Sequence, residues 1–158
     1  MSGPPYHIRA KPEDIAPRII VAGDPARVEQ VADMLKEAKL VNTNRGFLTY
    51  TGYYKNTPVT VATHGIGAPS AAIVFEELVM LGARAVIRLG TCGGLVKELR
   101  KGDMVIASGA AYPVGGGAIG MYVPDSCMPT APHPEVTLAL IDSAKENNVK
   151  FLLGPVIS

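Results

Sequence analysis

Short apolar runs alternate with glycine-containing turns along the chain, and this pattern predicts a series of strands. Runs rich in β-branched residues are typical of buried strands, because a strand covered on both faces shows no polar alternation. Such runs occupy residues 18–22, 86–89, 103–107 and 151–157. Asp24 and Pro25 follow the first run as a typical N-cap and first helical residue, so we expect a helix that continues to about Lys36.

The middle of the chain predicts a hairpin and a second helix. Two β-rich runs, residues 47–54 and 58–63, flank a short turn, and this arrangement is the signature of a hairpin. A junction with two glycines, residues 64–70, leads to a mostly apolar segment. We expect a helix there from about Pro69 to Leu81, packed between a sheet and another surface.

The C-terminal part predicts a loop, a helix and the last strand. Glycines and prolines are frequent in residues 115–134, which we expect to form a long surface loop. Pro134 and Glu135 start a helix that ends near Asn148. Strands that alternate with helices indicate an α/β protein. We expect a single domain over residues 1–158, three-layer-like, with a mixed, largely parallel central sheet flanked by helices.

Composition and charge narrow the function classes. The chain has 158 residues, of which 47% are hydrophobic and 18% charged, enough for one buried core. Its net charge of +1 gives no reason to expect nucleic acid or an anionic membrane as a partner. No apolar run approaches the roughly 20 residues of a membrane span, and the N-terminus lacks an apolar signal core, so we expect a cytoplasmic protein.

The two cysteines, Cys92 and Cys127, lack the spacing of a metal site. They lie 35 positions apart, with no C-x-x-C pair and no Cys/His ligand pattern. We therefore expect no zinc. The sequence leaves open whether the two thiols form a disulfide.

An arginine interrupts the apolar run at residues 86–89. Arg88 stays charged under ordinary conditions and is costly to bury without a partner. Two interpretations fit: an anion bound at the Gly-Thr-Cys-Gly-Gly turn that starts at Gly90, or a carboxylate paired with the arginine in the core. The glycines favour the anion because they let a ligand approach the backbone closely.

Strand-to-turn junctions at Gly23, His64 and Gly90 are expected to meet at one edge of the sheet. In sheets of this kind, ligands bind at the carboxyl ends of the strands. The side chains that these junctions carry are Arg27, Arg88 and Thr91. Two arginines, a hydroxyl and backbone N–H groups near glycines, including those expected to be free at the start of the helix after Gly23, suit an oxyanion the size of phosphate.

Other interpretations of these junctions stay open. Arg27 opposes the dipole at the start of its helix, which favours a binding role, but a solvated arginine explains it equally well. His64 is equally consistent with a hydrogen-bonded histidine at a strand end. A nucleotide-hydrolysing P-loop and a Rossmann dinucleotide site are disfavoured, because the turns lack G-x-x-x-x-G-K-[ST] and the pair Gly65 and Gly67 lacks the third glycine of G-x-G-x-x-G.

Successive short blocks resemble the nucleoside phosphorylase family that includes uridine phosphorylase, hexameric purine nucleoside phosphorylase and methylthioadenosine phosphorylase. The blocks are His7, Gly23-Asp24-Pro25 with Arg27, Asn44-Arg45-Gly46, Thr51-Gly52, His64-Gly65-Ile66-Gly67 with Pro69-Ser70, Glu76-Glu77-Leu78, and Ile87-Arg88 with Gly90-Thr91-Cys92-Gly93. Each block is weak alone, but their order is specific and covers nearly the whole chain.

The resemblance implies phosphorolysis, in which phosphate attacks the anomeric carbon of a nucleoside and gives ribose 1-phosphate and a free base. It implies no cofactor beyond phosphate as co-substrate, and it gives Arg88 the catalytic role. The implied phosphate ligands are Gly23, Arg27, Arg45, Arg88 and Thr91, and the implied nucleoside ligands are His7, Ile66, Cys92 and Gly93.

The resemblance also implies a homo-oligomer, a hexamer built as a trimer of dimers, in which His7 and Arg45 are donated to a neighbouring site. There Arg45 completes the phosphate site and His7 bonds the ribose 5′ side. The family extends beyond Ser158, so the C-terminal part of the domain, with further ribose and base ligands, is expected to be absent from this chain. The His64-Gly65 pair favours purine or methylthioadenosine-type nucleosides. A uridine phosphorylase, a nucleoside hydrolase and a non-catalytic nucleoside-binding relative stay open as alternatives.

Overall fold

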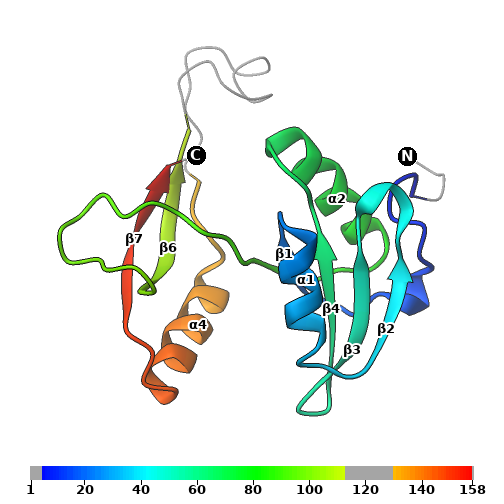
Figure 1. Cartoon of the computed structure of the whole chain (residues 1–158), viewed down its shortest axis with the longest axis horizontal. Helices are drawn as coiled ribbons and strands as arrows, with labels where there is room; N and C mark the ends of the chain where they lie inside the picture. Colours follow the sequence, from blue (N-terminus) through cyan, green and yellow to red (C-terminus); the bar gives the residue numbers. More distant parts are fainter. Residues whose placement is uncertain (1–4, 113–129, 158) are drawn as a thin grey trace. The chain divides into compact units, whose positions relative to one another are not determined.

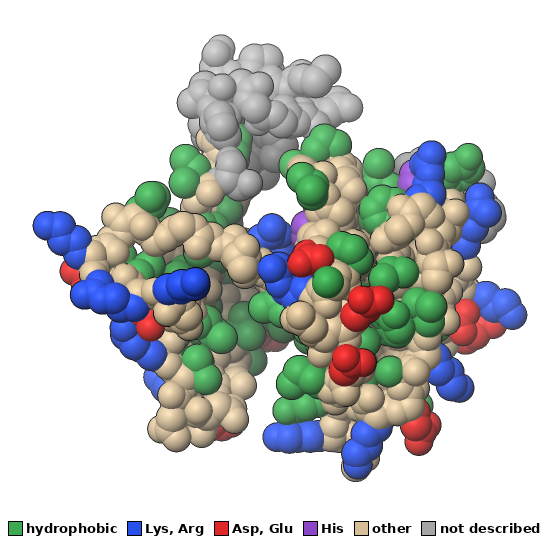
Figure 2. All heavy atoms as spheres, viewed as in Figure 1, with side chains coloured by type: hydrophobic (Ala, Val, Ile, Leu, Met, Phe, Trp, Pro, Cys, Tyr) green, Lys and Arg blue, Asp and Glu red, His purple; other side chains and the backbone are tan. Residues whose placement is uncertain are grey.

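The computed structural model describes residues 5–112 and 130–157. The chain divides into two compact units, Met1–Cys92 and Gly93–Ser158, which are treated separately below. The expectation of a single domain over residues 1–158 stays a prediction. On the face of the first unit that Figure 2 shows, acidic, basic and apolar side chains are interspersed, in keeping with the nearly balanced charge of the chain.

The first unit is a five-stranded mixed sheet with two α-helices (Figure 1). Its elements are β1 (Arg18–Ala22), α1 (Pro25–Ala32), β2 (Lys36–Asn42), β3 (Thr49–Tyr54), β4 (Thr57–Thr63), α2 (Ala68–Met80) and β5 (Ala85–Arg88), with short 3₁₀ helices at Pro12–Asp14 and Asn44–Gly46. The strand order is β2-β3-β4-β1-β5. β1 runs parallel to β4 and β5, whereas β3 is antiparallel to β2 and β4. The predicted α/β class with a mixed sheet flanked by helices is confirmed.

The side chains of β1 alternate between two cores, one on each face of the sheet. Ile19 and Val21 pack in a cluster with Val74 and Leu78 of α2. Ala22 packs in a second cluster with Val28 of α1. Because successive strand residues point to opposite faces, the two helices cover opposite sides of the sheet. This arrangement gives the first unit three layers.

The prediction that the first helix continues to about Lys36 was wrong. α1 ends at Ala32, and residues 36–42 form β2 at the edge of the sheet. All but the last two residues of β2 are exposed, so the strand shows no apolar alternation, and its Lys and Glu residues favour helix by propensity. Pairing with β3 makes this segment a strand instead of a helix. Gly52 on β3 permits the close approach, since a Cβ there would lie 2.8 Å from the carbonyl oxygen of Lys36.

In its described residues, 93–112 and 130–157, the second unit contains two parallel strands and one helix. Its elements are β6 (Met104–Ala111), α4 (Pro134–Glu146) and β7 (Phe151–Ile157). The expected burial of residues 103–107 was wrong in part, because Ile106 is the one buried residue of β6. Most of the predicted loop at residues 115–134 lies outside the described residues. No helix in the described part of the chain is long and apolar enough to cross a bilayer.

Candidate functional site

The carboxyl ends of β4, β1 and β5 lie side by side, as their parallel pairing requires. Past the end of β4, the backbone N–H of His64 donates to the carbonyl of Ala22 at 2.8 Å. Past the end of β5, the N–H of Leu89 donates to the carbonyl of Val21, also at 2.8 Å. The structure therefore brings together the three predicted junctions, because each starts at the same edge of the sheet.

Gly23 packs directly against the junction that follows β4. A Cβ at Gly23 would lie 3.0 Å from the carbonyl oxygen of Gly65 and 3.4 Å from Cε1 of His64. Gly65 itself has a φ of +71°, in the left-handed region that favours glycine. The hydroxyl of Ser70 donates to the carbonyl of His64 at 2.7 Å and holds this turn against the start of α2. A side chain at position 23 would displace this backbone.

The side chain of Arg88 is held by His64. Nε of Arg88 donates to Nε2 of His64 at 3.3 Å. The imidazole is 3% exposed and packs edge-on against Phe75. Burial lowers the pKa of His64 and the positive charge of Arg88 lowers it further, so the ring is neutral at pH 7 and Nε2 can accept this bond. None of the described carboxylates pairs with Arg88, which removes the core ion pair as its explanation.

The outer edge of the Arg88 guanidinium lies over Gly90. A Cβ at Gly90 would lie 2.5 Å from Nη1 and 3.0 Å from Cζ. Since Nε is engaged by His64, the two Nη groups are the donors left for a ligand. A planar pair of N–H donors matches two oxygens of a phosphate or carboxylate. The arrangement therefore presents one oriented cationic fork at the carboxyl edge of the sheet.

Arg27 lies in the first turn of α1 and is half-buried. The first amides of this helix already have acceptors. Oδ1 of Asp24 accepts from the N–H of Ala26 at 3.0 Å, and the carbonyl of Asp24 accepts from the N–H of Arg27 at 3.2 Å. The expectation that the helix start offers free N–H groups was wrong at these positions, because the N-cap uses them. An oxyanion at this junction depends on the Arg27 side chain.

The remaining predicted ligands near these junctions are exposed. Thr91 and Cys92 follow Gly90 in an irregular segment, and the thiol of Cys92 is free. Ile66 lies on the turn before α2 and is 95% exposed. Gly93 begins the second unit. Cys127, the other half of the possible disulfide, lies outside the described residues.

His7 and Arg45 form a second group around the ring of Tyr6. The rings of Tyr6 and His7 meet edge-on at 5.3 Å between centroids, and Cζ of Arg45 lies 6.0 Å from the Tyr6 centroid. The side-chain amide of Asn44 donates to the carbonyl of His7 at 2.9 Å. Arg45 is exposed and has a φ of 56°. The structure thus joins His7 to the Asn-Arg-Gly turn.

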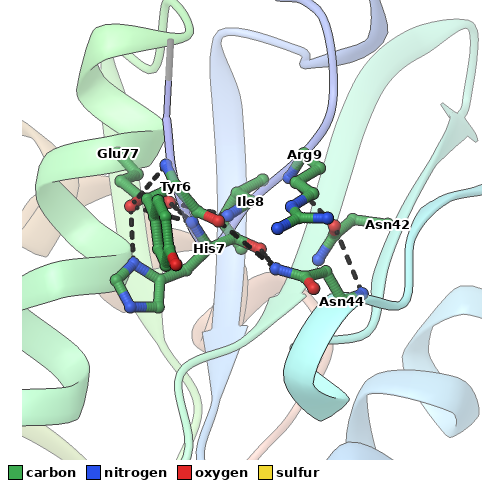
Figure 3. A network of polar contacts seen from close by, with 7 residues as sticks. All are labelled: Tyr6, His7, Ile8, Arg9, Asn42, Asn44 and Glu77. Carbon is green, nitrogen blue, oxygen red and sulfur yellow. Dashed lines mark hydrogen bonds and ion pairs between the residues drawn. The ribbon is translucent and has the colours of Figure 1, made fainter. Parts of the chain in front are cut away.

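The carboxylate of Glu77 anchors this second group through hydrogen bonds (Figure 3). It accepts hydrogen bonds from the backbone N–H groups of Tyr6, His7 and Ile8 and from Nδ1 of His7. Burial alone raises the pKa of Glu77, but the hydrogen bonds, first that from the Ile8 N–H, hold it below its usual range. The resemblance named Glu77 without a role. The sequence feature that could have indicated this role is the position of the carboxylate, which lies on the same helix face as the buried Val74 and Leu78.

The described residues contain no group of three or more His, Cys, Asp or Glu side chains that could hold a metal ion. The two groups bring together guanidinium and imidazole side chains. These groups can bind and orient an anion.

Comparison with known proteins places this chain in a family. The family model described as Phosphorylase superfamily matches residues 17–158. The chain is 38% identical over 152 residues to a uridine phosphorylase of Thermococcus kodakarensis, 42% identical over 151 residues to a uridine phosphorylase of Treponema pallidum, and 39% identical over 147 residues to a DeoD-type purine nucleoside phosphorylase of Mycoplasma genitalium. These alignments cover 96%, 96% and 91% of this chain, but 54%, 57% and 60% of the relatives.

A solved structure agrees with the same assignment. The crystal structure of purine nucleoside phosphorylase from Toxoplasma gondii in complex with immucillin-H superimposes with a TM-score of 0.91 at 38% identity. The superposition covers 100% of this chain and 64% of that one. The chain thus spans little more than half the length of the curated relatives it matches. From its motifs, its fold and these similarities, this chain belongs to the phosphorylase superfamily.

Proposed function

We propose that this protein is a nucleoside phosphorylase, in which inorganic phosphate attacks the anomeric carbon of a nucleoside and releases ribose 1-phosphate and a free base. The names of its relatives support the reaction class. The observation that carries the proposal is the Arg88 fork, held by a neutral and buried His64 at the edge where Gly23 also lies. An arginine oriented in this way suits a phosphate that must be bound without losing its nucleophilic oxygen.

The chemistry requires a fixed anion. Cleavage of a glycosidic bond develops positive charge on the sugar ring, so a phosphate dianion beneath the ring is both nucleophile and charge stabiliser. In the proposal, Arg88 is the catalytic residue that orients this phosphate. Arg27, Thr91 and the backbone at Gly23 complete its binding in the same subunit. No cofactor is needed, and we expect the rate to be unchanged after treatment with a chelator.

A neighbouring subunit completes the proposed site. His7 and Arg45 share the Tyr6 group, whereas Gly23 and Arg88 share the His64 group. Division of the predicted ligands into two groups supports donation of His7 and Arg45 to the site of an adjacent copy, as in a hexamer made of dimers. In the proposal, the nucleoside lies between the His64 group of one subunit and the Tyr6 group of its neighbour. It contacts Ile66, Cys92 and Gly93. The exposure of Ile66 is consistent with an element that a ligand or a neighbour covers.

The preferred nucleobase is the most detailed part of the proposal. The His64-Gly65 pair favours purine or methylthioadenosine-type nucleosides. Uridine is the second candidate, because two of the similar proteins are named uridine phosphorylase.

Base release with and without phosphate tests the proposal. The protein is incubated with uridine, inosine, guanosine, adenosine and methylthioadenosine, and both free base and ribose 1-phosphate are measured. We expect release that requires phosphate and yields equal amounts of the two products. Base release without phosphate would identify a hydrolase instead. Nucleoside binding with no turnover would identify a non-catalytic relative.

A further inference from the structure

The carboxylate of Glu77 holds His7 by its ring and by its backbone. Oε1 accepts from Nδ1 of His7 at 2.7 Å, and Oε2 accepts from the N–H groups of His7 and Ile8 at 2.9 and 2.6 Å. The N–H of Tyr6 donates to Oε1 at 3.0 Å. Glu77 is 8% exposed. A buried carboxylate with this many donors is fully satisfied and holds the segment that it binds rigidly.

These contacts determine which nitrogen of His7 carries a proton. Backbone N–H groups can only donate, so both oxygens of Glu77 act as acceptors. The hydrogen bonds also favour the ionised carboxylate, which has no proton to give. The proton between Oε1 and Nδ1 therefore belongs to the ring. In a neutral imidazole, a protonated Nδ1 leaves Nε2 with a free lone pair.

The Nε2 edge of His7 faces away from Glu77 (Figure 3). Tyr6 and Phe47 each meet the ring edge-on, with centroids at 5.3 and 6.0 Å. The His7 side chain is 19% exposed. Nothing in the described ranges 5–112 and 130–157 forms a hydrogen bond with Nε2. The ring is thus packed and oriented, and one acceptor atom is open to a ligand.

We propose that Glu77 is a positioning residue that holds His7 in its Nδ1-protonated form, so that Nε2 accepts a hydrogen bond from a hydroxyl of the bound ligand. This inference rests on the proposed function, and it takes from the family resemblance that His7 lies at the ribose 5′ side of a nucleoside in the neighbouring site. The hydrogen bond to Nε2 of His7 determines which substituent is preferred at the 5′ position of the nucleoside. A 5′-hydroxyl can donate to Nε2, whereas a 5′-deoxy or 5′-methylthio group cannot. Of the two substrate types that the His64-Gly65 pair favours, the inference therefore selects purine nucleosides with a free 5′-hydroxyl over the methylthioadenosine type.

The first test measures the protonation of His7 directly. Nitrogen-15 chemical shifts of the imidazole distinguish a protonated ring nitrogen from an unprotonated one. The shifts are followed as the pH is raised until they no longer change, so that the ring under study is neutral. In the wild-type protein we expect protonated Nδ1 and unprotonated Nε2. In Glu77→Gln, an amide NH₂ group replaces one acceptor oxygen, so we expect the proton to move toward Nε2. The opposite tautomer, or a doubly protonated ring, in the wild-type protein would overturn the inference.

The second test measures selectivity. kcat/KM is compared for the nucleoside that the wild-type protein cleaves fastest and for its 5′-deoxy analogue. Loss of one hydrogen bond predicts a preference of about tenfold for the hydroxyl. We expect Glu77→Gln to reduce the preference toward one. Glu76→Gln, the same change at an exposed neighbouring position of α2, should retain it.

A second variant covers the case in which Glu77→Gln does not fold. His7→Phe keeps a ring of similar shape and leaves the backbone bonds to Glu77 in place, and we expect it to lose the preference as well. An unchanged preference in either folded variant, or no preference in the wild-type protein, would refute the inference. If the wild-type protein cleaves no nucleoside, the proposed function fails, and the tautomer of His7 still decides the role of Glu77.

Discussion

Nε of Arg88 donates to Nε2 of His64 at 3.3 Å, and this bond connects the carboxyl end of β5 to that of β4 across β1. The bond uses the one N–H of Arg88 that lies nearest its aliphatic stem. It leaves the two Nη groups above Gly90. A buried neutral ring is a suitable partner, because it orients the guanidinium without cancelling its charge.

Arg88→Ala is expected to lower kcat/KM for phosphate about a hundredfold or more, since an oriented donor to the reacting anion is removed. Steady-state kinetics with varied phosphate and calorimetric titration of phosphate measure the effect. Arg88→Lys keeps the positive charge but loses the planar pair of Nη donors and the Nε bond. Its kcat/KM for phosphate should therefore lie between the values of the wild-type protein and of Arg88→Ala. Thermal melting should change little, because Arg88 is exposed. Near-normal kinetics in Arg88→Ala would contradict the proposed phosphate site.

Gly90→Ala tests the position of the guanidinium without removing it. The added methyl would lie 2.5 Å from Nη1, so the end of the Arg88 side chain must move. We expect the KM for phosphate to rise about tenfold, because a small displacement of a positioning group is costly for the reaction. Gly154→Ala in β7 is the control, since its methyl would make only an ordinary contact at 3.5 Å. Equal phosphate KM values in the two variants would argue against this placement of Arg88.

The lowered pKa of His64 predicts a pH-dependent stability. Because burial and Arg88 hold this pKa below its usual value near 6.5, the unfolded chain takes up a proton there before the folded protein does. Stability from this group is therefore lost as the pH falls below about 6.5, with a slope of at most about 1.4 kcal/mol per pH unit. Urea unfolding of wild type and His64→Gln between about pH 5 and pH 8 should show a smaller slope in the variant.

His133→Gln is the control for that experiment, because His133 lies exposed at the start of α4. Its unfolding free energy should follow the wild-type pH profile. Parallel profiles for wild type and His64→Gln would show that His64 is not held neutral by its surroundings.

Subunit mixing tests the proposed donation of His7. Arg88→Ala alone is expected to be nearly inactive, and His7→Ala alone is expected to keep about a tenth of wild-type activity, because it loses one hydrogen bond to the nucleoside. After the two variants are mixed in equal amounts and allowed to exchange subunits, about a quarter of wild-type activity should return, because half of the dimers are mixed and each mixed dimer has one intact site. Arg27→Ala mixed with Arg88→Ala should give no recovery, since every site then lacks one arginine. Native mass spectrometry verifies the exchange, and no recovery in mixed dimers would place His7 in its own subunit's site.

Local sequence signals were sufficient to predict the strand-to-helix junctions of the first unit. The Asp24-Pro25 pair starts α1 where the sequence predicts it, and the glycines at 65 and 67 mark the turn before α2. Because parallel strands end at a common edge, the meeting of Gly23 and His64 followed from topology alone. The partner of Arg88 did not follow, because the sequence does not show that its side chain reaches across β1 to the residue after β4.

The strand β2 and the contacts of Glu77 were missed for different reasons. β2 is an exposed edge strand, so its identity depends on pairing with β3 and not on its own pattern. Glu77 and His7 are 70 positions apart, and a helix that is mostly apolar gives no sign of what its one buried carboxylate binds. Long-range polar contacts of this kind are set by tertiary structure.

Glu77 recognises the peptide groups of residues 6–8 more than their side chains, and this has a consequence for the protein in acid. Its lowered pKa means that the ionised form stabilises the fold above the usual carboxyl pKa, and that this contribution disappears as the pH falls through the folded value. We expect protonation of Glu77 to weaken the hold on residues 6–8 while the sheet stays paired. Amide hydrogen exchange at Tyr6, His7 and Ile8 should accelerate with acidification ahead of exchange in β1 and β4, so acid should free His7 before it opens the sheet.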